Sequence, residues 1–65
     1  MIKAPGVKVT LVGQDGNVFN IIGIVAKALR KAGFAQLATE YTNACFGGSS
    51  YDEVLRITME YVEVT

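Results

Sequence analysis

The stretch GQDGNVFNIIGIVAKALRKAGF, residues 13–34, decides the fold. Its apolar residues recur at steps of three and four, the spacing of one helix face, and they are Val18, Ile21, Ile22, Val25, Ala28, Leu29 and Ala32. Basic residues follow near the C-terminal end, where they offset the negative pole of the helix dipole. Gly33, followed by Phe34, is typical of a Schellman stop. The stretch therefore predicts a long amphipathic helix that starts at the polar turn and ends before Gly33.

Strands and further helices are predicted on both sides of this helix. Residues 7–12 and 60–64 alternate apolar and polar side chains, the period-two pattern of a strand with one buried face. A second helix is expected over residues 34–45, before Gly47-Gly48 breaks it. Ser50 and Glu53 have the spacing of a capping box, which predicts a third helix over residues 51–58.

The element order is thus β-α-α-α-β, in one α+β domain that spans residues 1–65. Residues 1–6 are expected to form a flexible leader, because Pro5-Gly6 punctuates the chain before regular structure begins. We expect the two terminal strands to pair antiparallel, with the three helices packed on one face. A sheet of two strands has two open edges, which can pair with another copy of the chain. A hydrophobic content of 51% is also high for 65 residues, because so small a domain has little interior in which to bury apolar side chains. A homo-oligomer is therefore predicted.

Composition argues against several classes of partner. Six basic and six acidic residues cancel, so the chain has no overall field that would draw it to nucleic acid or to anionic lipid. The apolar run over residues 21–26 is too short to span a membrane. One cysteine and no histidine give neither a disulfide nor the ligand spacing of a metal site. We expect a cytoplasmic protein with no cofactor, no metal, no nucleic acid and no membrane as partner.

The candidate ligand site lies at the start of the first predicted helix. A glycine-containing turn there precedes free backbone amides and the positive pole of the helix dipole, which together suit a phosphate or a carboxylate. A polar track then continues along the helix face opposite the apolar stripe. The predicted ligand-binding residues are Gln14, Asp15, Gly16, Asn17, Asn20, Gly23 and Lys27.

An alternative interpretation needs no ligand. Asp15 and Asn17 are ordinary helix caps, basic residues in a last turn are ordinary dipole partners, and Gly23 can serve a tight helix crossing. Catalysis is not expected under either interpretation. Cys45 falls on the apolar face of the second helix, which indicates core packing, and no histidine is present to activate it. We therefore predict that the protein is not an enzyme.

Several segments of the chain are similar to those of a known group of proteins. The longest is VKVTLVGQDGNVF, residues 7–19, and the others are Ile22-Gly23, residues 28–33, residues 50–52 and residues 59–62. By these residues the chain resembles a group of short proteins encoded by phages and prophages, which share a Gly-x-Asp-Gly-Asn turn before a long helix. The resemblance implies the cytoplasm of an infected or lysogenic bacterium. It also implies stoichiometric binding, either of a phosphate-bearing nucleotide signal of host defence or of a host protein that the chain inhibits. An accessory virion protein is the remaining alternative.

Overall fold

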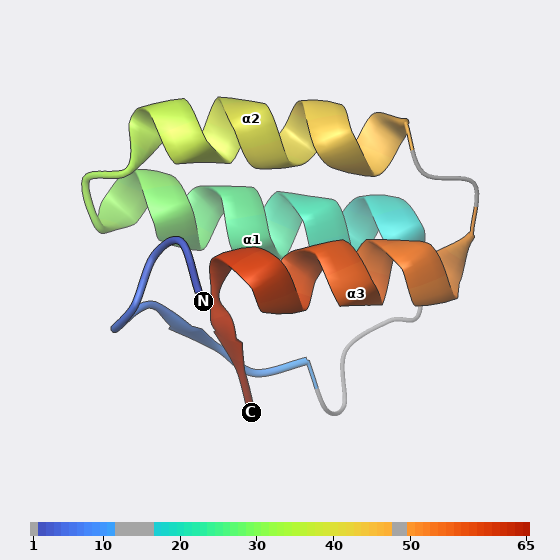
Figure 1. Cartoon of the computed structure of the whole chain (residues 1–65), viewed down its shortest axis with the longest axis horizontal. Coiled ribbons are helices and arrows are strands. Elements are labelled where there is room, and N and C mark those ends of the chain that lie inside the picture. The colour runs from blue at the N-terminus through green and yellow to red at the C-terminus, as the bar shows by residue number, and fades with distance from the viewer. Residues whose placement is uncertain (1, 12–16, 48–49) are drawn as a thin grey trace.

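The computed structural model describes residues 2–11, 17–47 and 50–65 (Figure 1). Its elements, in chain order, are β1 Lys8–Val9, α1 Val18–Lys31, α2 Ala35–Phe46, α3 Tyr51–Tyr61 and β2 Glu63–Val64. The three helices contact one another, and α1 and α3 also contact the strands, β1 and β2 respectively. Helix α2 packs against α1 and α3 and contacts neither strand. The α+β element order predicted from the sequence is confirmed.

The two strands pair in parallel, so the predicted antiparallel pairing is wrong. Lys8 lies opposite Glu63, and Val9 lies opposite Val64. The cause is the path between the strands. Successive helices run in opposite directions (Figure 1), so after three of them the chain enters β2 in the direction in which it left β1. Antiparallel strands are typically joined by a short hairpin, whereas a long helical crossover is the connection of parallel ones.

Both strands are shorter than the alternating patterns indicated. Glu60 and Tyr61, predicted as strand, belong instead to α3. Val54, Thr58 and Tyr61 are spaced by four and three residues, and all three are buried, so the helical period continues to the end of α3. Backbone pairing does extend beyond the strands, because the Leu11 amide donates to the Thr65 carbonyl at 3.4 Å.

The helix ends follow the capping signals of the sequence. The predicted Schellman stop of α1 is confirmed, since the Phe34 amide donates to the Leu29 carbonyl at 2.8 Å and the Gly33 amide to that of Arg30 at 3.0 Å. Gly33 has φ +91°, in the left-handed region that favours glycine. At the start of α3 the Glu53 amide donates to Ser50 Oγ at 3.2 Å, so the predicted serine cap is also confirmed.

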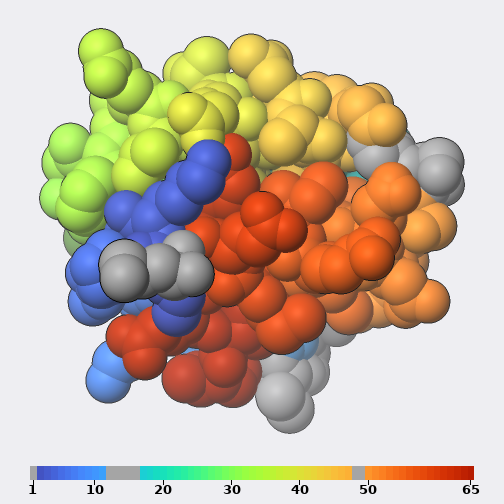
Figure 2. Space-filling view, in the orientation of Figure 1, coloured from blue at the N-terminus to red at the C-terminus, as the bar shows by residue number. Residues whose placement is uncertain are grey.

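The core lies where the three helices meet. Its largest fully buried side chains include Tyr41, Ile21, Leu29 and Val25, and Cys45 is buried with them, as predicted. Residues 2–5, which belong to the expected leader, pack on the C-terminal end of α3 (Figure 2). Ala4 is completely buried, and the amides of Lys3 and Ala4 donate to the carbonyls of Glu60 and Tyr61. Ala4 is therefore part of the core, and backbone hydrogen bonds hold Lys3 and Ala4 against the end of α3.

Every helix within the described ranges is too short or too polar to cross a lipid bilayer.

Candidate ligand-binding face

The structure places four of the seven predicted site residues, all of them at or on α1. Gln14, Asp15 and Gly16 lie outside the described residues. Asn17 is the N-cap of α1, and its Oδ1 accepts a hydrogen bond of 2.8 Å from the Phe19 amide. The capping role considered for Asn17 is therefore confirmed, and its side-chain oxygen is engaged by the helix itself.

The other three residues are exposed and share one side of α1. We define the α1 polar face as Asn20, Gly23, Lys27, Arg30 and Lys31, all of which are exposed. The opposite side of the helix is buried through Ile21, Ile22, Val25, Ala26 and Leu29. The α1 polar face extends over about 16 Å of helix, at 1.5 Å per residue. Asn20, Gly23 and Lys27 thus lie on an open track of exposed residues.

The cations of the α1 polar face form no ion pair with any acidic residue that the structure describes. Among the described residues the one ion pair joins Lys3 and Glu40, at 2.7 Å and on another side of the molecule. Lys27, Arg30 and Lys31 have no acidic partner within those same ranges. Three exposed cations within five residues create a local positive potential, although the chain as a whole is neutral.

No contact among the described residues explains Gly23. A Cβ atom built at this position meets no atom of the described residues within 4 Å, so none of their helices or backbone segments crosses α1 there. The tight helix crossing considered from the sequence is therefore absent. A glycine in a helix interior costs roughly 1 kcal/mol against alanine, and no contact within the described residues offsets this cost.

Two exposed aromatic residues extend the α1 polar face, and the sequence reasoning missed both. The side chains of Phe19 and Phe46 are 68% and 59% exposed, and their ring centroids lie 5.9 Å apart. The signal for Phe19 was present, because it falls outside the apolar stripe and lies four residues before Gly23. Phe46 was missed because the predicted second helix ended at Cys45, one residue too early.

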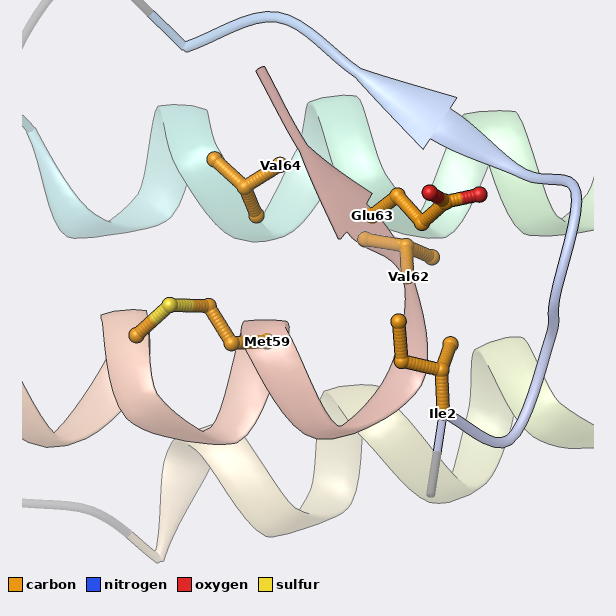
Figure 3. A pocket seen from close by; sticks show the side chains of 5 residues that line it. All are labelled: Ile2, Met59, Val62, Glu63 and Val64. Carbon is orange, nitrogen blue, oxygen red and sulfur yellow. The ribbon is translucent and has the colours of Figure 1, made fainter.

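A second surface feature lies beside β2. A hollow of about 300 Å³ is lined by Ile2, Met59, Val62, Glu63 and Val64 (Figure 3). Met59 is 55% exposed and Val64 is 37% exposed, so apolar side chains meet solvent next to the outer edge of the sheet. The sequence predicted open strand edges, but not the hollow that α3 and the N-terminal segment build beside one of them.

The titratable groups with shifted pKa values in the described residues take part in hydrogen bonds between elements or are buried in the core. Hydrogen bonds from Lys3 and from Tyr61 lower the pKa of Glu40. Burial, followed by the hydrogen bond to Glu40, raises the pKa of Tyr61. Burial also raises the pKa of the Cys45 thiol, which keeps it protonated and a poor nucleophile. Within the ranges described, no three histidine, cysteine or acidic side chains are grouped to hold a metal ion.

Fold and surface together define a class: a small α+β domain with an open cationic helix face and an apolar hollow at a strand edge. No protein-family model, no curated protein and no solved structure matches the chain.

Proposed function

We propose that this chain is a non-enzymatic, homo-oligomeric binding protein that sequesters a phosphate-bearing small molecule, namely a nucleotide signal of host defence. The observation that carries the proposal is the line of cations on α1, which have no ion-pair partner among the described residues and which continue from the exposed Gly23. The phage-type resemblance supplies the biological setting.

The α1 polar face offers the chemistry that a phosphate needs. Lys27 and Lys31 provide ammonium groups, and Arg30 provides a planar guanidinium that can bind two phosphate oxygens at once. The Asn20 amide can donate to a further oxygen. At Gly23 a ligand can approach the helix backbone without meeting a side chain. In the proposal, Gln14, Asp15, Gly16 and Asn17 complete the site at the N-terminal end of the helix.

Oligomerisation gives this open face a way to hold a ligand. Small-molecule sites typically enclose most of the ligand surface, and a single exposed helix face cannot do so. Two copies that present their α1 polar faces to each other would enclose one ligand between them. Sequestration requires only tight binding, which agrees with a proposal that assigns no catalytic residue.

The test is ligand retention by charge-reversal variants. Wild type, Lys27→Glu and Lys8→Glu are purified from defence-active cells, and the compounds released by denaturation are identified by mass spectrometry. Lys8 is exposed on β1, so Lys8→Glu makes the same charge change away from α1. We expect wild type and Lys8→Glu to release the same phosphate compound and Lys27→Glu to release none. Equal retention by both variants would contradict the proposal.

The hollow beside β2 favours a second candidate function, a protein-interaction module that inhibits a host factor. An extended segment of a partner can pair with an open strand edge and place apolar side chains in an adjacent hollow. Met59→Glu would then abolish capture of one defined host protein, whereas Gln36→Glu, an exposed change on α2, would not. If Lys27→Glu removes the phenotype and Met59→Glu leaves it intact, this second function is excluded.

A further inference from the structure

We propose that the Phe19–Phe46 pair stacks on the base of the bound nucleotide, while Lys27 and Lys31 hold its phosphates. This inference rests on the proposed function and deepens it. It assigns a base subsite to two residues from different helices and gives the ligand a direction along α1.

The first observation is a row of residues along α1. Phe19, Gly23 and Lys27 are spaced by four residues, and Lys31 continues the series. Residues four apart are neighbours on a helix surface, so these side chains lie in one ridge. Along this ridge Phe19 and Lys27 are separated by about 12 Å. The ridge therefore presents an aromatic ring, a gap of one side chain and then two cations.

The gap at Gly23 is the second observation. No atom of residues 2–11, 17–47 or 50–65 lies within 4 Å of the position that a Cβ atom would occupy. Side chains on a helix lean towards its N-terminus, so the long Lys27 side chain is directed towards this gap. A phosphate group placed there lies between the ammonium group and the open backbone. The base end of the same molecule then reaches Phe19.

The third observation is that the Phe19 and Phe46 rings contact each other and are also exposed to solvent. They lie 5.9 Å apart with an interplanar angle of 43°, yet both remain more than half exposed. Their mutual contact restrains them, because one comes from the start of α1 and the other from the end of α2. An exposed and restrained aromatic surface suits stacking with a planar base. The nearby cations favour an anionic molecule that carries such a base over an uncharged aromatic compound.

The inference can be tested by calorimetric titration with matched probes. The probes with a base are AMP, ADP and cyclic di-AMP, and those without one are ribose 5-phosphate and pyrophosphate. We expect Phe19→Ala to weaken binding of the base-containing probes by roughly 5- to 150-fold, the usual effect of removing one stacking ring. Binding of the base-free probes should not change. Phe19→Tyr should retain affinity, and Gln36→Ala, which truncates an exposed side chain at the end of α2 opposite to Phe46, should have no effect.

Each of the other possible outcomes overturns either the base subsite or the proposed function. If Phe19→Ala weakens both sets of probes equally, or neither, the base subsite is wrong while phosphate binding by α1 stands. If Lys27→Ala leaves the affinity of every probe unchanged, or wild type binds none of them, the proposed function itself fails. If Phe19→Ala lowers the oligomer mass in sedimentation velocity, the rings are covered by another copy of the chain, and the base subsite is likewise overturned.

Discussion

The Tyr41 hydroxyl donates a hydrogen bond of 2.7 Å to Thr58 Oγ1 inside the core, which joins α2 to α3. The direction follows from the next bond, because the Thr58 hydroxyl donates its own proton to the Val54 carbonyl at 2.7 Å. Among the described residues, every buried side-chain nitrogen or oxygen has a hydrogen-bond partner. This chain of two bonds satisfies the polar groups at the centre of the α2–α3 contact.

Breaking the Tyr41–Thr58 bond from one side should cost more than replacing both partners. Thr58→Val leaves the buried Tyr41 hydroxyl with only the Cys45 sulfur, a weak acceptor, and we expect a loss of about 1–3 kcal/mol in the free energy of unfolding. Tyr41→Phe should cost about 1 kcal/mol, because the Thr58 proton keeps its own acceptor. The double variant should be less destabilised than the sum of the two losses. Urea denaturation measures all three, and strict additivity would show that the hydrogen bond contributes nothing.

Alanine should have opposite effects at two glycines of the same helix. Gly23→Ala should raise the free energy of unfolding by about 1 kcal/mol, because the position is helical and open. Gly33→Ala should lower it by about 1–2 kcal/mol, because φ there is +91°. If the α1 polar face binds the ligand as proposed, Gly23→Ala also weakens that binding. Thermal and urea denaturation of the ligand-free variants decide the signs, and destabilisation by Gly23→Ala would reveal a contact at that position.

The Lys3–Glu40–Tyr61 cluster should make stability depend on acid pH. Hydrogen bonds from Lys3 and then Tyr61 hold the pKa of Glu40 below its ordinary value of about 4.3. The cluster therefore contributes fully above about pH 4.3, and its contribution disappears as the pH falls through the lower pKa of the folded state. Thermal melts from pH 7 to pH 2 measure this contribution as the difference in melting temperature between wild type and Glu40→Gln. This difference in melting temperature should shrink below pH 4. A difference that stays constant to pH 2 would contradict this assignment.

Asn17 requires a variant that separates capping from binding. Asn17→Ala removes the acceptor for the Phe19 amide and should cost about 1 kcal/mol in the free energy of unfolding. Asn17→Ser keeps a capping oxygen and should restore most of this loss. Denaturation of both variants checks the cap. Ligand retention by Asn17→Ser would then show whether the asparagine amide is needed beyond capping, and equal stability of both variants would rule out the cap as a stabilising contact.

Local signals predicted much of the fold. The cap at Ser50, the stop at Gly33 and the amphipathic stripe of α1 all act over a few residues, so their patterns can be read directly from the chain. The strand direction was missed because it depends on how three helices reverse the chain, not on any local pattern. The alternating pattern over residues 60–64 wrongly predicted a strand that begins at Glu60, for a related reason. Tyr61 also fits the helical series of Val54 and Thr58, and burial in the core favours the helix.

The candidate face was predicted in part. Asn20, Gly23 and Lys27 lie exposed on one side of α1, as their spacing indicated. The pairing of Phe19 with Phe46 was not predicted, because it depends on the packing of α2 against α1. The hollow beside β2 was beyond prediction for the same reason, since Ile2 and Met59 are brought together only by the folded N-terminal segment.

We propose that this chain is an oligomer that sequesters a phosphate-bearing molecule through α1. Native mass spectrometry of protein purified gently from defence-active cells tests it most directly, because one spectrum reports both the number of subunits and any retained ligand. We predict an oligomer with extra mass that denaturation releases as a nucleotide, and the same oligomer without that mass for Lys27→Glu. A monomer, or an oligomer that carries no extra mass, would contradict the claim.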